Sequence, residues 1–220
     1  MGSLRYPEDA RSWPVDFRLK ESDSFFGERG VVHRTLRTLA DRLREETIPF
    51  AIVGGMALNL HGYRRETVDV DILMTREGLA RFHERLVGRG YTLAFSGARK
   101  TFRDPDTGVK VEVLTTGEFP GDGKPKPVAF PDPAHVSVNL EGYPVITLEK
   151  LIDLKLASGL SAPHRMGDLV DVQRLVEELH LPQDLDAKLD PSVRAEYHRL
   201  WELAQHAGEG PQERGGGPSL

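Results

Sequence analysis

Hydrophobic positions in the first part of the chain alternate between helical spacing and short apolar runs. Apolar residues recur every three or four positions over residues 31–46, which predicts an amphipathic helix. An apolar run over residues 50–53 predicts a strand that ends at two glycines, and residues 56–61 predict a brief helix. Alternation of apolar and polar residues over 68–73 predicts a second strand.

The pattern continues with strands and then changes to helix. Thr75 can cap a helix that reaches about residue 89. A Gly- and Pro-rich segment at 115–133 predicts a long loop. The remaining expected elements are strands at 91–95, 100–103 and 109–114, hairpin strands at 135–140 and 143–146, and helices at 148–159, 166–180 and 191–207.

These elements divide the chain into four parts. Residues 1–29 carry prolines and charges without a sustained period, so we expect an extended arm. Residues 30–146 hold the predicted strands, and residues 147–207 are predicted to be helical. Residues 208–220 are poor in apolar side chains and are expected to be disordered.

Composition excludes several classes of protein. The chain has 220 residues, of which 39% are hydrophobic, so it can form a real core. Its formal net charge of −5 argues against a wholly basic nucleic-acid coat. The absence of cysteine excludes a disulfide scaffold, a thiolate zinc site and a cysteine nucleophile. No apolar stretch resembles a signal core or a membrane span, so we expect a cytoplasmic protein without a membrane partner.

Two aspartates stand out in the second predicted strand. Residues two apart on a strand point to the same face, so Asp69 and Asp71 should project together. Val68, Val70 and Ile72 should then face the core on the opposite side. Neighbouring carboxylates raise each other's pKa unless a cation lies between them. Such hard oxygen ligands suit Mg²⁺, which commonly binds carboxylates together with substrate phosphates.

Two further features fit this chemistry. Glu112 is a single acid in a valine-rich strand and is the candidate third carboxylate, although an acid on the solvent face of an edge strand has the same pattern. Gly54 and Gly55 join a strand to a helix, where backbone N–H groups can approach a polyphosphate. An ordinary strand-to-helix turn explains the two glycines equally well.

Charged residues elsewhere are candidates for nucleotide contacts. Arg65 lies just before the aspartate strand and could reach phosphate oxygens, or it could be a solvated loop arginine. Lys155 occupies a helical position that the pattern expects to be apolar. It therefore needs a carboxylate or a nucleotide phosphate as partner, unless its stem extends to the surface. Arg165, Asp168 and Asp171 share one helix face, which local ion pairing also explains.

Together these residues resemble a known superfamily. The glycine pair, the short helix, the two aspartates and the later strand acid are similar to the DNA polymerase β-type nucleotidyltransferases. More narrowly, the chain resembles the AbiEii-type group of bacterial nucleotidyltransferases, several of which are toxins of toxin–antitoxin pairs. The resemblance covers about residues 31–180. The motifs that carry the narrower resemblance are Arg65-x-Thr67-x-Asp69-Val70-Asp71, Leu151-Ile152-Asp153-Leu154-Lys155 and Arg165-x-x-Asp168-x-x-Asp171.

The resemblance implies an α+β nucleotidyltransferase fold: a mixed β-sheet flanked by helices, with a helical C-terminal portion. Residues 30–146 would be the catalytic domain. Gly54 and Gly55 would hold the triphosphate. Two Mg²⁺ ions would be bound, with Asp69, Asp71 and Glu112 as ligands. Further nucleotide contacts would come from Arg65, Thr67, Lys155 and Asp168.

The activity implied is transfer of a nucleoside monophosphate from a nucleoside triphosphate such as ATP to a hydroxyl acceptor. The acceptor could be an RNA end such as that of tRNA, a protein or a small molecule. A cognate antitoxin is a further expected partner. Glu112 would also help to deprotonate the acceptor hydroxyl. The alternative is a non-catalytic module that keeps the fold and only binds a nucleotide or a partner protein.

Overall fold

The structure is a computed structural model, and it describes residues 29–140 and 142–206. The predicted extended arm, apart from its last residue, and the predicted disordered tail lie outside the described residues. Within the described ranges, no helix is long and apolar enough to cross a membrane.

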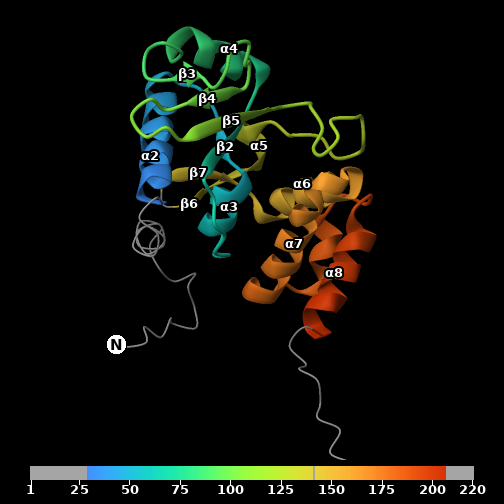
Figure 1. Cartoon of the computed structure of the whole chain (residues 1–220). Helices are drawn as coiled ribbons and strands as arrows, with labels where there is room; N and C mark the ends of the chain where they lie inside the picture. Colours follow the sequence, from blue (N-terminus) through green and yellow to red (C-terminus); the bar gives the residue numbers. More distant parts are fainter. Residues whose placement is uncertain (1–28, 141, 207–220) are drawn as a thin grey trace, which may run out of the picture.

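The centre of the molecule is a seven-stranded sheet in the order β3-β4-β5-β2-β1-β7-β6 (Figure 1). The β1–β7 and β2–β5 pairs are parallel and the other pairs are antiparallel, so the sheet is mixed. The strands are β1 Ala51–Ile52, β2 Asp69–Met74, β3 Thr92–Leu93, β4 Thr101–Arg103, β5 Lys110–Thr115, β6 Ser137–Leu140 and β7 Tyr143–Ile146.

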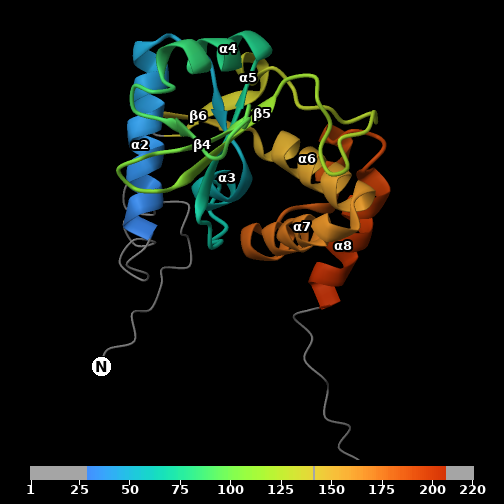
Figure 2. The same cartoon turned by 45° about the horizontal axis from the view of Figure 1, so that its top comes forward.

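Four helices pack against the sheet or its edges (Figure 2). Helices α2 and α3 contact β2, α4 contacts β5, and α5 contacts β1. Their bounds are α2 Arg29–Glu45, α3 Gly54–Leu60, α4 Arg76–Arg85 and α5 Pro133–Val136. The apolar stripe predicted for α2 is completely buried at Leu36, Leu39 and Leu43, because the amphipathic helix turns that stripe toward the sheet.

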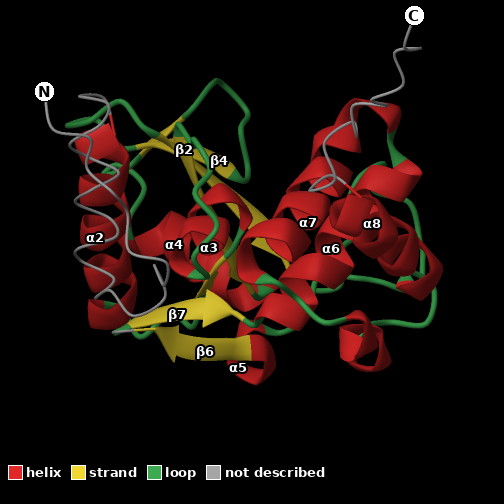
Figure 3. Ribbon diagram, turned by 90° about the horizontal axis from the view of Figure 1, so that it is seen from below, coloured by secondary structure: helices red, strands yellow, loops and turns green. Residues whose placement is uncertain are grey.

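The C-terminal helices pack on one another beside the sheet, as the view from below shows (Figure 3). They are α6 Leu148–Ser161, α7 Met166–Leu179 and α8 Arg194–His206, with 3₁₀ turns at Pro163–Arg165 and Gln183–Lys188. Helix α6 begins at Thr147, whose hydroxyl accepts a hydrogen bond from the Lys150 amide. The mixed sheet with flanking helices and the helical C-terminal portion confirm the predicted fold class.

Several local predictions need correction. Val68 does not face the core but is 75% exposed, because the ladder begins only at Asp69. The strand expected at 91–95 contains only Thr92–Leu93. The last helix begins at Arg194 instead of residue 191, because the segment after Pro191 forms a turn first. In contrast, Val70 and Ile72 are fully buried, as alternation predicts.

Candidate functional site

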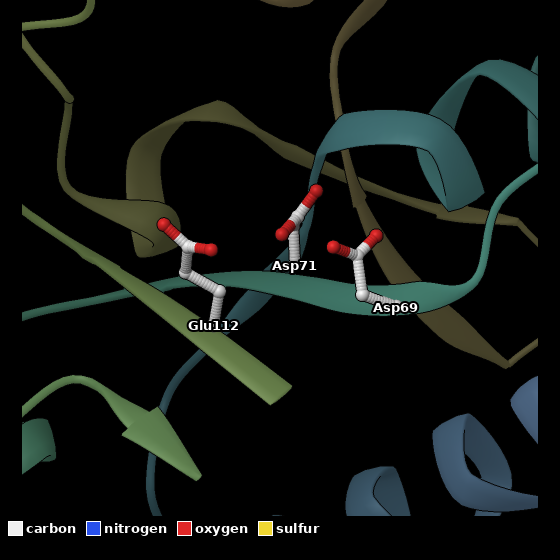
Figure 4. A group of neighbouring side chains, drawn as sticks. All are labelled: Asp69, Asp71 and Glu112. Carbon is white, nitrogen blue, oxygen red and sulfur yellow. The ribbon is translucent and has the colours of Figure 1, made fainter. Parts of the chain in front are cut away.

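Three carboxylates from two strands meet on one face of the sheet. Asp71 on β2 is the register partner of Glu112 on β5, and Asp69 lies two residues before Asp71 on the same face. One ligand oxygen from each of the three lies within 4.8 Å of those of the other two. Figure 4 shows the three side chains rising from the same side of the strands toward one another. Because β5 lies between β4 and β2, Glu112 is not on an edge strand.

The turn before α3 brings the backbone of Gly54 directly against Asp71. Gly54 has a φ of +61°, and a Cβ atom built on it would lie 2.0 Å from Asp71 Oδ2. The backbone N–H of Val53 also donates to the Asp71 carbonyl at 3.1 Å. Only glycine combines this left-handed conformation with such a close approach. The glycine pair is therefore part of the acidic site and not a remote turn.

The loop between α3 and β2 is held close to the same carboxylates. Thr67 Oγ1 donates to the Asp69 backbone carbonyl at 3.1 Å and lies 3.3 Å from Asp69 Oδ1. A Cβ at Gly55 would lie 2.9 Å from Thr67 Oγ1, so glycine is needed here too. The Asn59 side chain makes two hydrogen bonds to the Arg65 backbone, at 2.9 and 2.7 Å. These contacts fix the direction in which the loop presents its side chains.

Burial and repulsion among the acids both disfavour the charged form of Asp71. Burial, followed by the charges of Asp69 and Glu112, raises the pKa of Asp71 to about 7. The positive charges of Lys110 and Lys155 act in the opposite direction but do not outweigh these causes. A carboxyl group in this environment favours any nearby cation that offsets the repulsion.

Lys110 lies among the three acids. It is the register partner of Asp69 on β5 and lies two residues before Glu112 on the same face. Its Nζ is 3.0 Å from Asp69 Oδ2 and 2.9 Å from Glu112 Oε2. Burial lowers the pKa of Lys110, but the hydrogen bonds to Glu112 and Asp69 outweigh this effect and hold its pKa above the ordinary value.

A second charged cluster joins the loop before β2 to helices α6 and α7. Lys155 Nζ is 3.0 Å from Asp168 Oδ1 and 2.7 Å from Asp171 Oδ2, and all three side chains are at least nine-tenths buried. Arg65 Nη1 reaches the same Asp171 Oδ2 at 2.8 Å. The inward Lys155 therefore has carboxylate partners, one of the alternatives that its sequence position requires.

Asp168 has the most completely satisfied carboxylate of this cluster. Besides Lys155, it accepts hydrogen bonds from Ser158 Oγ at 2.7 Å and Arg165 Nε at 2.9 Å. Burial raises the pKa of Asp168, but the charge of Lys155 and the donated hydrogen bonds outweigh it and hold the pKa below its ordinary value. Asp168 thus holds Lys155 and Arg165 in place as a permanent anion.

Sequence reasoning missed three residues of these clusters. Lys110 carried a usable signal, because it lies two residues from Glu112 on a strand and must share its face. Asn59 and Ser158 carried no signal, since both are ordinary polar residues within helices. Their partners come from distant segments, so only the tertiary structure reveals their contacts.

The donor set of the three carboxylates suits a hard divalent cation. Mg²⁺ binds oxygen ligands and often retains water and substrate oxygens in its shell. The oxygens of Asp69, Asp71 and Glu112 are close enough for shared coordination. Burial, and after it the charges of Asp69 and Glu112, raise the pKa of Asp71, and a cation among the three carboxylates would offset both effects. The residues present therefore fit a Mg²⁺ site.

Comparison with known proteins gives likeness at the level of structure only. No protein-family model matches the chain, and no curated protein matches it. A Thermotoga maritima protein with the provisional description of nucleotidyltransferase is 24% identical to this chain, with a TM-score of 0.40. The match covers 67% of this chain and 91% of that protein. An antigenic nucleotidyltransferase-like protein from Paracoccidioides brasiliensis is 14% identical with a TM-score of 0.43, and the match covers 81% of this chain and 88% of that protein.

A third likeness is to ANT(2")-Ia, whose structure was solved with adenylyl-2"-tobramycin. It is 12% identical with a TM-score of 0.38, covering 80% of this chain and 90% of its own. At these values the likenesses do not by themselves assign a family or an activity to this chain.

Proposed function

We propose that the protein is a Mg²⁺-dependent nucleotidyltransferase that transfers a nucleoside monophosphate from a nucleoside triphosphate to a hydroxyl acceptor. The observation that carries this proposal is the meeting of Asp69, Asp71 and Glu112 on one face of the sheet, with the Gly54 backbone packed on Asp71. The sequence resemblance to the polymerase β-type superfamily depends on the same residues, and the resemblance to its AbiEii-type group adds the motifs around Lys155 and Asp168.

Each group has a role in the proposed reaction. Asp69, Asp71 and Glu112 would hold the metal, which would supply positive charge against the charge that develops on the α-phosphate. A new bond forms between the acceptor oxygen and the α-phosphorus, while the bond from that phosphorus to the pyrophosphate oxygen breaks. Glu112 takes the proton that the acceptor hydroxyl loses, and pyrophosphate leaves.

The nucleotide itself would lie between the acidic site and the second cluster. Gly54 and Gly55 leave room beside the carboxylates for a triphosphate, because they present no side chain there. Lys155 lies near enough for its charge to lower the pKa of Asp71, so it can also attract phosphate oxygens. Arg65 has a 41% exposed side chain and can bind phosphate oxygens while Asp171 holds one of its nitrogens.

The acceptor class remains open among an RNA end such as that of tRNA, a protein hydroxyl and a small molecule. The decisive experiment incubates the protein with Mg²⁺, each labelled nucleoside triphosphate and a cell extract. We expect label to move to one acceptor class. We expect none with the double variant Asp69→Asn, Asp71→Asn, and undiminished transfer by that variant would contradict the proposal.

One contact favours a second candidate, a module that binds a nucleotide or partner without catalysis. Lys110 already offsets part of the negative charge of Asp69 and Glu112, as in a structural ion-pair cluster. Calorimetric titration with Mn²⁺ separates a metal site from a structural ion-pair cluster. A metal site should bind Mn²⁺, in the parent or once Lys110 is replaced by Met, and should lose that binding in Asp71→Asn. A structural cluster should bind no ion in any of these forms.

A toxin role is the finer proposal that the AbiEii-type resemblance supports. Expression should then arrest bacterial growth, and Asp71→Ala should abolish the arrest. Coexpression of the product of the adjacent gene should restore growth if that product is the antitoxin. Growth arrest that persists in the Asp71→Ala strain would indicate general toxicity of overexpression.

A further inference from the structure

The ladder between β2 and β5 fixes four charged side chains at the corners of a small square. Asp69 is paired with Lys110, and Asp71 is paired with Glu112. Because both strands have a period of two, all four side chains leave the same face of the sheet. The square therefore holds three carboxylates and one ammonium, and it carries net negative charge when all four are ionised.

The ammonium of Lys110 contacts one oxygen each of Asp69 and Glu112, two of the three carboxylates that are proposed to hold the metal. It lies 3.0 Å from Asp69 Oδ2 and 2.9 Å from Glu112 Oε2, so it fills the space between those carboxylates. A divalent ion held by these carboxylates would lie about 2.1 Å from its ligand oxygens. Two cations between the same pair of carboxylates repel each other, so one of them must leave.

The ammonium of Lys110 is able to leave, whereas the two aspartates are held in place. The backbone of Lys110 is fixed in the ladder, but its long stem has four rotatable carbons and is 36% exposed, which gives the ammonium a path to water. Asp69 is held by Thr67 through its backbone and its carboxylate. Asp71 is confined by the Gly54 backbone.

We propose that Lys110 is a tethered counter-ion of the metal site, which competes with a divalent ion for Asp69 and Glu112 and is displaced when the ion binds. This inference rests on the proposed metal-dependent function. Lys110 is a positioning residue in this scheme: it keeps the two carboxylates together and lowers their affinity for free metal. A triphosphate that carries its own cation offers the displaced ammonium a new anionic partner.

The test compares Mn²⁺ binding to four forms of the full chain by calorimetric titration. Lys110→Met removes the charge and keeps much of the stem, while Lys110→Arg keeps the charge. The matched control is Lys100→Met: Lys100 is equally exposed at 36% and pairs with Glu118, outside the acidic site. We expect Lys110→Met to bind Mn²⁺ about tenfold more tightly or better, and the other two variants to match the parent.

Thermal unfolding provides a second readout that does not depend on activity. In EDTA, Lys110→Met should melt at a lower temperature than the parent, because three carboxylates then repel without a cation. Mn²⁺ should restore the melting temperature of Lys110→Met. The rise in melting temperature that Mn²⁺ causes should therefore be larger for Lys110→Met than for Lys100→Met.

Each outcome of the titration either supports or contradicts the competition between Lys110 and the metal. Equal or weaker Mn²⁺ binding by Lys110→Met would overturn the competition while leaving the metal site intact. Binding by Lys110→Met alone would support the competition in its strongest form. If no form binds Mn²⁺, both this inference and the metal-dependent function are wrong.

Discussion

The close approach of Gly54 to Asp71 leads to a sharp prediction for the substitution Gly54→Ala. The residue has a φ of +61°, a conformation that costs an L-residue roughly 1–2 kcal/mol. The new Cβ would also lie 2.0 Å from Asp71 Oδ2 and 2.8 Å from its Cγ. The Asp71 carboxylate must then move by about 1 Å or more, and overpacking of this kind adds roughly 1–3 kcal/mol.

Gly88→Ala is the matched control for backbone strain. Gly88 has a φ of +76°, is exposed, and has nothing within 4 Å of the position that a Cβ would take. It should therefore lose only the conformational part of the unfolding free energy, about 1–2 kcal/mol. Its metal binding should be that of the parent, because the residue lies on the turn after α4.

The assay is urea unfolding with EDTA and with saturating Mn²⁺, at one pH. Gly54→Ala should be less stable than Gly88→Ala in EDTA, and it should gain little stability from Mn²⁺, while Gly88→Ala gains as much as the parent. Equal losses in EDTA and equal gains from Mn²⁺ would refute the argument that the glycine makes room for the acidic site.

Three further predictions follow from the electrostatics of the two clusters. Because burial and neighbouring acids raise the pKa of Asp71 to about 7, its ionisation opposes folding, so stability in EDTA should fall as pH rises from about 4 through 7. Asp71→Asn should remove that fall and be more stable than the parent at pH 8 by about 4 kcal/mol, measured by urea unfolding at pH 5 and 8. A lower stability of the variant at pH 8 would contradict this reasoning. Asp168 has a lowered pKa, so its stabilising contribution is present above about pH 4 and is lost as the pH falls through its pKa in the folded state. Asp168→Asn should lower the free energy of unfolding at pH 7 by about 3 kcal/mol, because it leaves the buried Lys155 without this carboxylate. An unchanged free energy of unfolding would show that Lys155 does not depend on Asp168. Arg65→Met should change the free energy of unfolding by less than about 1 kcal/mol, since the arginine side chain is 41% exposed. The same variant should raise KM for the nucleotide and leave kcat little changed. An unaltered KM would show that Arg65 does not bind the nucleotide.

Local sequence determined the part of the site that depends on local geometry. The period of two along β2 places Asp69 and Asp71 on one face whatever the strand pairs with. The left-handed turn at the glycine pair and the caps at Thr75 and Thr147 are likewise consequences of nearby residues. The expected strand and helix order agrees with the structure except at element ends and at the short helix α5 Pro133–Val136, where a loop and the start of a strand were expected.

Only the tertiary structure decided which distant groups share a site. The sequence pattern was compatible with Glu112 on either an edge strand or an inner strand. In the structure β5 pairs with both β4 and β2, and this places Glu112 beside Asp71. The sequence was likewise compatible with a phosphate or a carboxylate as the partner of Lys155, or with a stem that extends to the surface. Packing of α6 on α7 brings two aspartates to the Lys155 ammonium. Strand order and helix packing join segments far apart in the sequence, and their energies depend on the whole core, so no local pattern encodes them.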